Sequence, residues 1–442
     1  MKPLHVGLIG FGTVGRGTWD VLRRNAEEIA RRAGRPIRIN WIATRTLDRA
    51  REGTRGVTGI NLTNDPSVVV RHPDVDIVCE LIGGIEPART LVLEAIAHGK
   101  HVVTANKALL AHHGNEIFAA ASAKGVMVAF EAAVAGGVPI IKALREGLSA
   151  NRIEWIAGII NGTSNFILSE MRSRGAGFAE VLAEAQQRGY AEADPTFDVE
   201  GIDAAHKLTI MSAIAFGVPM QFDKAYAEGI TKLTREDIRY ADELGYRIKL
   251  LGITRRATAN GREGIELRVH PTLIPHKRLI ANVEGAMNAV LVKGDAVGAT
   301  LHYGAGAGAE PTASAVIADL VDVTRMHTAD PEQRVPHLAF QPDQLTDLPF
   351  LPMGDVVTSY YLRMRVDDRP GVLADITRIL ADREISIVAM IQKEPDEGED
   401  QTDIILLTHK TVERNIDDAI AKIESLPTVR GAIVRIRLEE LN

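Results

Sequence analysis

The sequence contains a single cysteine, Cys79, and therefore cannot form an intramolecular disulfide. A chain that folds without disulfides is typical of a reducing compartment, so we expect the protein in the cytoplasm. Residues 1–4, Met-Lys-Pro-Leu, lead directly into a predicted strand, which predicts that the chain has no signal peptide.

Long hydrophobic runs and an excess of positive charge are also missing. The longest apolar stretch, residues 126–141, is interrupted by a glutamate, two glycines and a proline, and it is too short to cross a membrane. The net charge of −7 argues against a nucleic-acid-binding protein. We therefore expect neither a membrane nor a nucleic acid as a partner.

The remaining composition is that of a globular protein, with 45% hydrophobic and 25% charged residues. A length of 442 residues allows two or three domains. The patterns along the chain divide it into residues 1–135, residues 136–325, a connector over residues 326–358, and a last domain over residues 359–442.

The most regular motif lies at the N-terminus. Residues 4–10 read as a buried parallel strand, and Gly10-Phe11-Gly12-Thr13-Val14-Gly15 leads from it into an amphipathic helical pattern. A strand, Gly-x-Gly-x-x-Gly and a helix form the dinucleotide-binding fingerprint, in which glycines admit a pyrophosphate to the helix N-terminus. The alternative is a purely structural turn. We predict an α/β, Rossmann-type doubly wound domain over residues 1–135.

The second predicted strand, residues 37–43, bears on cofactor choice. An NAD enzyme usually has an acid near the end of this strand, whereas this chain has Arg45, with Arg49 and Arg51 nearby. A guanidinium suits the 2′-phosphate of NADP, so the sequence favours NADP over NAD. A solvated basic loop is the alternative.

Further predicted strands at residues 76–81, 100–104 and 126–131 continue the βα pattern. Lys107 and Glu131 follow or end two of these strands, where ligands gather in open α/β sheets. We predict that Lys107 lies near the nicotinamide or the substrate, although it could be an ordinary solvated lysine.

Five carboxylates precede a single amine in the segment 189–207. The acids are Glu192, Asp194, Asp198, Glu200 and Asp203, and the amine is Lys207. The apolar run 208–216 predicts a buried helix, which places Lys207 near the core, where desolvation lowers the pKa of a lysine. Asp203 and Lys207 are spaced i, i+4 and share a helix face; an ordinary surface ion pair is the alternative. We predict that this segment is catalytic.

The middle region reads as an α+β domain with an open sheet over residues 136–325. Strands are predicted at residues 156–160, 266–271 and 289–293. The loop Asn161-Gly162-Thr163-Ser164-Asn165 is either a helix cap or the wall of a site. The run Gly304–Gly308 precedes a predicted helix at 312–323, and serves either a ligand or close packing.

The connector, residues 326–358, holds five prolines. Strands at 360–366, 385–392, 403–409 and 429–438, with helices at 372–381 and 412–426, give the order βαββαβ of a ferredoxin-like fold. The acidic residues 394–400 predict a mobile hairpin loop.

Taken in order, the motifs resemble one family. Gly10–Gly15, Thr104-Ala105-Asn106-Lys107, Glu131-Ala132-Ala133-Val134, Asn161–Asn165 and the stretch 189–207 resemble homoserine dehydrogenase, and Asp368-Arg369-Pro370-Gly371 in the last domain resembles an ACT domain. The resemblance to the long form with a C-terminal ACT domain covers nearly the whole chain. It implies that the enzyme interconverts L-aspartate 4-semialdehyde and L-homoserine with NADP or NAD, on the route to threonine, methionine and isoleucine.

The resemblance also implies residue roles. Lys207 would be the acid/base that protonates the carbonyl oxygen as hydride arrives, and Lys107 would lie near the reacting oxygen. Glu192 and Asp203 would hold the substrate's amino group or orient the lysine, and Asp198 would belong to the same pocket. The expected cofactor contacts are Gly10, Phe11, Gly12, Thr13, Val14, Gly15, Arg45, Lys107, Gly189, Glu192 and Gly308.

Three further expectations come from the resemblance. A monovalent cation, usually sodium, would be held by the Glu131 side chain and the carbonyl oxygens of Val134, Gly136 and Val138, a hard-donor set. The chain would form a dimer or tetramer. The ACT domain would bind an amino acid, and we expect feedback inhibition by threonine; a structural dimerisation domain is the alternative.

Two other functions are compatible with parts of the sequence. A dehydrogenase for another small amino-acid aldehyde would keep Lys207 and the glycine-rich loop. A non-catalytic sensor would bind nucleotide and amino acid but would need neither Lys107 nor Lys207, so the presence of both lysines argues against it.

Overall fold

The computed structural model describes residues 2–395 and 398–442, which form two units. The first contains the chain up to Ile156 together with His206–Asp223 and Met287–Asp347, and the second contains Ala157–Ala205, Lys224–Ala286 and Leu348–Asn442. Residues 396–397, in the middle of the acidic segment for which a mobile loop was predicted, lie outside the described residues.

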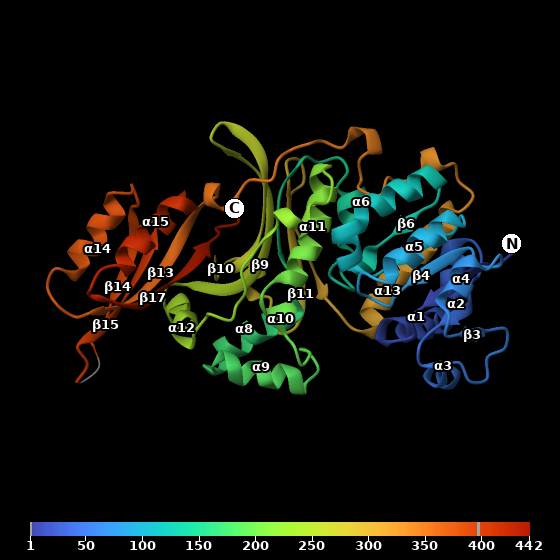
Figure 1. Ribbon diagram of the computed structural model, residues 1–442, viewed down its shortest axis with the longest axis horizontal. Coiled ribbons are helices and arrows are strands. Elements are labelled where there is room, and N and C mark those ends of the chain that lie inside the picture. The colour runs from blue at the N-terminus through green and yellow to red at the C-terminus, as the bar shows by residue number, and fades with distance from the viewer. Residues whose placement is uncertain (1, 396–397) are drawn as a thin grey trace. The chain divides into compact units, whose positions relative to one another are not determined.

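The first unit is built on a parallel sheet with the strand order β3-β2-β1-β4-β5-β6 (Figure 1). The sequence order changes direction at β1, which is the doubly wound arrangement predicted from the sequence. The strands are β1 (Leu4–Ile9), β2 (Ile37–Ala43), β3 (Asn61–Thr63), β4 (Ile77–Glu80), β5 (His101–Thr104) and β6 (Val128–Ala129).

Helices between these strands cover the sheet, and one helix from much later in the chain joins them. The local helices are α1 (Thr13–Arg24), α2 (Ala26–Ala33), α3 (Leu47–Gly53), α4 (Pro66–Arg71), α5 (Ala88–Ala97) and α6 (Lys107–Lys124). The later helix is α13 (Ala309–Met326), and its residues Ala313, Val316 and Leu320 share a core with Leu4 and Val6 of β1. The nucleotide-binding fold is therefore completed by residues some 300 positions away in sequence.

The first unit also holds short elements after β6. They are the 3₁₀ turn η1 (Glu131–Ala133), α7 (Ile140–Lys142), the π-helical turn η2 (Ala143–Gly147), and the antiparallel hairpin β11 (Met287–Gly294) and β12 (Gly298–Ala305). The predicted strand at 126–131 is reduced to two residues, because Glu131 begins η1. The helix α11 (Ile202–Phe216) begins in one unit and ends in the other.

The second unit contains a mostly antiparallel sheet in which β7, β9, β10, β17, β13, β15 and β14 follow one another, and β8 pairs with β10. Its strands are β7 (Ile153–Ile159), β8 (Tyr226–Ala227), β9 (Tyr246–Ala259), β10 (Arg262–Pro275), β13 (Val357–Asp367), β14 (Ile387–Gln392), β15 (Gln401–Thr408), β16 (Thr411–Val412) and β17 (Val429–Leu438). Its helices are α8 (Gly162–Arg174), α9 (Phe178–Gln187), α10 (Thr196–Val199), α12 (Arg235–Glu243), α14 (Val372–Ala381) and α15 (Glu413–Glu424).

The last part of the chain has the predicted βαββαβ order. Apolar residues of β13 alternate inward at Tyr360, Leu362, Met364 and Val366, and they pack against α14 and α15, which lie side by side over the sheet (Figure 1). The sheet of this domain also continues into the middle region. The last strand, β17, pairs in parallel with β10 at Thr272↔Arg437 and Leu273↔Leu438, so one sheet continues through both.

Candidate active site

The glycine-rich loop after β1 is shaped by its first and last glycines. Gly10 has φ of 101°, and a Cβ there would lie 2.7 Å from the carbonyl oxygen of Leu81. A Cβ at Gly15 would overlap the carbonyl oxygen of Gly10, because α1 packs tightly on the loop. Gly12, the N-cap of α1, faces open space. The loop therefore leaves room for a ligand beside Gly12, at the positive end of the helix.

A cavity of about 520 Å³ opens beside this loop. Its wall includes Gly10, Phe11, Gly12 and Arg45, four residues predicted from the sequence to bind the cofactor, and also Arg49. Thr13, Val14 and Gly15 lie in the first turn of α1. A glycine-rich loop, a helix N-terminus and two guanidinium groups give this cavity the features of a dinucleotide phosphate site.

A buried carboxylate that the sequence analysis missed fixes the next loop. Glu80, at the end of β4, is fully buried and accepts hydrogen bonds from the amides of Ile82 (3.0 Å) and Gly83 (3.2 Å) and from Thr104 Oγ1 (2.7 Å). Burial raises the pKa of Glu80, and these hydrogen bonds offset part of that rise. A buried acid at the carboxyl end of a strand was the available signal, because Glu80 directly follows the apolar run of β4.

The same hydrogen-bond chain positions Lys107. Thr104 Oγ1 accepts from the amide of Asn106 (3.0 Å), and the Asn106 side chain caps α6 by accepting from the amide of Leu109 (3.0 Å). Lys107 is therefore the first residue of α6 and is half-buried. The Thr-Ala-Asn-Lys motif serves to hold this lysine at the end of β5.

Lys207 lies on α11 with 9% of its surface exposed, in agreement with the predicted burial. The helices that carry the two lysines meet at a histidine pair. His206 Nε2 and His112 Nε2 are 3.2 Å apart, and both rings contact Phe222. His112, which is exposed, thus links α6 to α11.

One asparagine holds two of the predicted carboxylates. Asn161 Nδ2 donates to Asp198 Oδ1 (2.7 Å) and to Asp203 Oδ2 (2.8 Å), while its Oδ1 accepts from the amide of Ser164 (2.8 Å) and caps α8. Asp203 is buried, with 3% exposure, and Asp198 is half-buried. The loop that was predicted to be a cap or a site wall is thus a cap whose side-chain NH₂ group donates to the two acids.

The rest of this loop secures the neighbouring chain. Ser164 Oγ donates to the carbonyl oxygen of Asp198 (3.0 Å), and Thr163 Oγ1 donates to that of Tyr190 (2.6 Å). Glu192 is exposed on the segment between α9 and α10, where Gly189 has φ of 73°. The structure therefore brings Asp198 and Asp203 together at Asn161, and it leaves the Glu192 side chain exposed.

The turn proposed to hold a cation is anchored at Glu131. This residue is 1% exposed; its amide donates to Asp319 Oδ2 (2.8 Å), and its carboxylate accepts from the amides of Ile141 (2.9 Å) and Lys142 (2.8 Å). Burial raises the pKa of Glu131, partly offset by these two amides. The Glu131 carboxylate thus already serves as a cap for α7.

The backbone after Glu131 makes an unusual turn. Ala135 and Gly136 have φ of 54° and 51°, and a Cβ at Gly136 would overlap the carbonyl oxygen of Gly306. The predicted carbonyl ligands, Val134, Gly136 and Val138, all belong to this turn. The glycine run that follows β12 packs against it and ends at Gly308, which has φ of 128° and begins α13.

Two features are absent from the described ranges 2–395 and 398–442. No group of three or more histidine, cysteine, aspartate or glutamate side chains has an arrangement suited to a metal ion. No helix there combines the length and the apolar character needed to pass through a bilayer.

Comparison with known proteins covers the whole chain. The family model "Homoserine dehydrogenase, NAD binding domain" matches residues 10–131, the model "Homoserine dehydrogenase" matches residues 139–321, and the model "ACT domain" matches residues 360–428. A homoserine dehydrogenase of Pseudomonas aeruginosa is 63% identical, and one of Neisseria gonorrhoeae is 59% identical, each over 100% of both chains.

Solved structures agree. The crystal structure of a homoserine dehydrogenase from Thiobacillus denitrificans has 73% sequence identity and a TM-score of 0.95, and the match covers 100% of this chain and 99% of that one. The dinucleotide fold, the catalytic region and the ACT domain predicted from the sequence are thereby confirmed. The chain belongs to the homoserine dehydrogenase family, NAD(P)-dependent oxidoreductases that interconvert L-homoserine and L-aspartate 4-semialdehyde.

Proposed function

We propose that Lys207 is the acid/base of this reaction and that Asp198 and Asp203 hold the ammonium group of the substrate. The observation that carries the proposal is the double hydrogen bond from Asn161 to the two acids. It fixes Asp203 in the first turn of α11, one turn before Lys207 on the same helix. A group that binds the amino-acid end is thus tied to a group that can move a proton.

The proton step follows from the charge that develops on the substrate. The nicotinamide cofactor, when bound, supplies the acceptor or donor of hydride. As homoserine is oxidised, its hydroxyl proton passes to the neutral amine of Lys207, while the carbon that bears the hydroxyl loses hydride to the cofactor. In the reverse direction, the Lys207 ammonium stabilises the oxygen that gains negative charge and then protonates it. Lys107 adds a second positive charge near that oxygen.

Substitution of Lys207 by alanine tests this role. We expect kcat to fall by about 10²- to 10⁴-fold, the usual contribution of a general acid or base. Cofactor affinity, measured by quenching of protein fluorescence, should stay unchanged because the cavity beside Gly12 is untouched. Retention of most of the wild-type kcat would reject Lys207 as the acid/base.

Asp198→Asn and Asp203→Asn test the substrate assignment. Each should raise KM for homoserine more than KM for the cofactor, because a carboxylate that binds ammonium is lost while the hydrogen bond from Asn161 can still be accepted. Glu192→Gln serves as a comparison, since Glu192 is also predicted to bind the substrate but is exposed. If all three variants behave alike, the carboxylate cluster has no special role.

NADP is proposed as the preferred cofactor. Arg45 and Arg49 both line the cavity beside the glycine-rich loop, where guanidinium groups suit a 2′-phosphate. The comparisons support an NAD(P) cofactor without separating the two forms. Initial rates with NADP and NAD at equal concentrations decide the preference.

A monovalent cation, sodium, is proposed at the turn after Glu131. The available ligands are all oxygen atoms, namely the buried carboxylate of Glu131 and the carbonyl groups of Val134, Gly136 and Val138. Two successive residues with positive φ make this turn tight. The cation would neutralise the buried acid and hold the turn against the glycine run. Replacement of NaCl by choline chloride should lower the melting temperature as well as the rate.

An exposed strand at the edge of the second sheet bears on association. Strand β14 is the last in the order of its sheet and exposes Val388 (56%) and Met390 (45%). An apolar edge strand favours pairing with a second copy, so we propose a homo-oligomer, a dimer or tetramer, formed at least partly through this edge. Met390→Lys should lower the molar mass measured by light scattering if the edge is used.

The ACT domain is proposed to bind threonine, and threonine bound there is proposed to inhibit the enzyme. The reason is that threonine is an end product of the route to threonine, methionine and isoleucine. Titration of threonine against the homoserine-dependent rate tests this. Serine is the control ligand, and an unchanged rate at millimolar threonine contradicts the proposal.

The cytoplasm is the proposed location, because the only cysteine, Cys79, is fully buried in β4 and is not a disulfide partner.

A further inference from the structure

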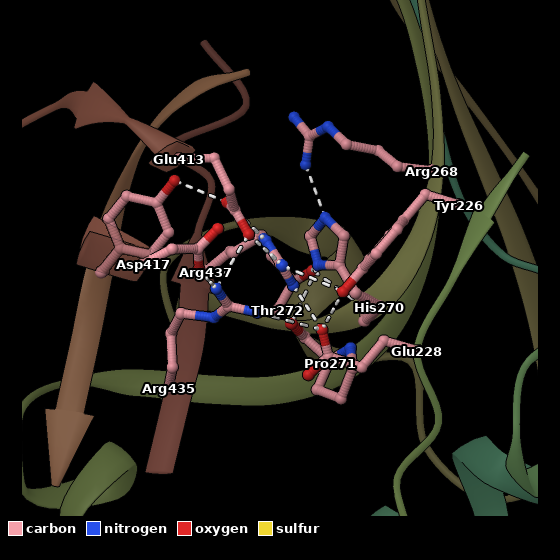
Figure 2. A network of polar contacts seen from close by, with 11 residues as sticks. Tyr226, Glu228, Arg268, His270, Pro271, Thr272, Glu413, Asp417, Arg435 and Arg437 are labelled. Carbon is pink, nitrogen blue, oxygen red and sulfur yellow. Dashed lines mark hydrogen bonds and ion pairs between the residues drawn. The ribbon is translucent and has the colours of Figure 1, made fainter. Parts of the chain in front are cut away.

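A fully buried guanidinium lies where the last strand joins the middle of the sheet. Arg437, in β17, is 0% exposed. It donates to Glu228 Oε2 (2.7 Å) and to Tyr226 OH (3.2 Å) on one side, and to Glu413 Oε2 (3.0 Å) on the other. Figure 2 shows the guanidinium between these partners. Arg437 therefore links α15 of the last domain to the segment that contains β8.

The carboxylates of this network are kept ionised by the buried guanidinium. Burial alone would raise the pKa of Glu228 and of Glu413, but the positive charge of Arg437 and its hydrogen bonds lower both. Tyr226 OH also donates to Glu228 Oε2 (2.7 Å), and Tyr360 OH donates to Glu413 Oε2 (2.6 Å). Each carboxylate is thus held by Arg437 and by one tyrosine, and Arg435 forms an ion pair with each, which fixes their positions.

The segment after Glu228 contacts the short helix that carries Asp198. The amide of Ile230 donates to the carbonyl oxygen of Val199 (2.8 Å), and Thr231 Oγ1 donates to Glu200 Oε1 (2.9 Å). A Cβ at Gly229 would overlap both Val199 and Glu200. Residues 229–231 therefore lie directly against the end of α10.

The end of α10 in turn sets the two acids. Asp198 precedes Val199, and its carbonyl oxygen accepts from the amide of Gly201 (3.2 Å), immediately before α11 begins. Its side chain shares Asn161 with Asp203. Residues 229–231 are therefore in contact with the backbone that sets Asp198 relative to Asp203. A continuous line of contacts runs from Arg437 through Glu228 to the carboxylate cluster.

We propose that Arg437 and Glu228 are positioning residues for Asp198, acting through the backbone of residues 229–231. The proposal rests on the assignment of Asp198 and Asp203 to the substrate's ammonium group. It makes the arrangement of the last domain a determinant of homoserine affinity. A purely structural network, by contrast, would alter stability without altering one KM selectively.

Glu228→Gln in the full chain is the first test. This change keeps the shape of the side chain and leaves Arg437 paired with Glu413, so the variant retains a compensated buried charge. We expect KM for homoserine to rise about 3- to 30-fold, with KM for NADP and kcat changed less than twofold. Thermal unfolding shows whether the fold is kept.

A matched control comes from a second buried ion pair that joins the same parts of the chain. Arg363 of β13 donates to the fully buried Asp237, which caps α12 (Nε–Oδ1, 2.7 Å). Arg363 also donates to Thr234 and to the second oxygen of Asp237, and Asp237 accepts from Tyr361 OH; none of these residues belongs to α10. Arg363→Lys should lower the melting temperature about as much as Glu228→Gln, with no selective rise of KM for homoserine.

Gly229→Ala tests the path without changing any charge. The added methyl group must displace residues 229–231 from Val199 and Glu200, so KM for homoserine should rise while KM for NADP stays constant. If Glu228→Gln and Gly229→Ala both keep KM for homoserine within twofold, the positioning role is overturned, even where Asp198→Asn raises that KM and upholds the substrate assignment. If Asp198→Asn itself has no effect, the substrate assignment fails and the positioning role fails with it.

Discussion

The nucleotide cavity and the carboxylate cluster are built in opposite ways. The cavity is made by backbone: Gly10, Gly12 and Gly15 shape one local loop, and the helix that follows supplies the amides. The cluster is made by side chains from separate segments, with Asn161 holding Asp198 and Asp203. The first can be recognised in six consecutive residues, whereas the second exists only once the chain has folded. Substitutions should therefore affect the two sites by different mechanisms.

Asn161→Ala should give the largest effect. It removes two hydrogen bonds to charged groups, each worth about 1.5–3 kcal/mol, and it also removes the cap of α8. We expect kcat/KM for homoserine to fall about 100-fold while KM for NADP is unchanged. Steady-state kinetics with each substrate varied in turn measures this. Equal losses for homoserine and NADP would mean that the cluster is not separate from the nucleotide cavity.

Two glycine variants separate fold from binding in the cavity. Gly12→Ala meets open space, so the melting temperature should be kept while NADP affinity falls about tenfold, because the methyl group lies where the phosphates approach. Gly15→Ala would overlap the Gly10 carbonyl and should cost about 1–3 kcal/mol of unfolding free energy. Fluorescence titration and thermal unfolding of both variants give the comparison, and a stable Gly15→Ala protein would contradict it.

Arg45→Gln should have a smaller effect, because one exposed charge contributes about 1 kcal/mol or less to binding. We expect kcat/KM for NADP to fall about fivefold, with kcat/KM for NAD unchanged. Gln cannot form the bidentate contact with a phosphate. An equal fall for both cofactors would remove the argument for NADP from this residue.

A pH test probes a side-chain anchor of the turn after β6, the hydrogen bond that the Glu131 amide donates to Asp319. Burial raises the pKa of Asp319 to about 7, with Lys142 acting in the opposite direction. Between the ordinary value of 3.8 and about 7 the folded chain holds a proton that the unfolded chain lacks, so this group makes the protein less stable as pH rises through that window.

Asp319→Asn should remove this dependence while keeping an acceptor for the Glu131 amide. The difference in unfolding free energy between wild type and variant should change by at most about 1.4 kcal/mol per pH unit between pH 4 and 7. Urea unfolding at several pH values measures it. A constant difference over that range would show that Asp319 does not titrate there.

The sequence was sufficient where local pattern determines the structure. The glycine-rich loop, the burial of Lys207 and the βαββαβ order follow from spacing and periodicity, and the last strand was placed at 429–438, the observed bounds of β17. These features depend on residues that are neighbours in the chain, so no tertiary information was needed.

The sequence was insufficient where buried polar groups interrupt the pattern. Strand β9 was missed because it contains Lys249, which is 2% exposed and donates to Asn165 Oδ1 (3.1 Å) and to the carbonyl oxygen of Val283 (2.6 Å). Strand β12 was missed because it is rich in small and polar residues and none of it is fully buried. The dual role of Asn161 depends on partners 37 and 42 residues away, which spacing does not reveal.

The pairing of β17 with β10 has a consequence for how the second unit responds to heat and to ligands. Since one hydrogen-bonded sheet runs from β9 to β14, the last domain is not an independent melting unit. Amide hydrogen exchange in β10 should slow when a ligand binds only to the C-terminal domain. Calorimetry should show that such a ligand raises the midpoint of a single unfolding transition shared by the C-terminal domain and the strands β9 and β10.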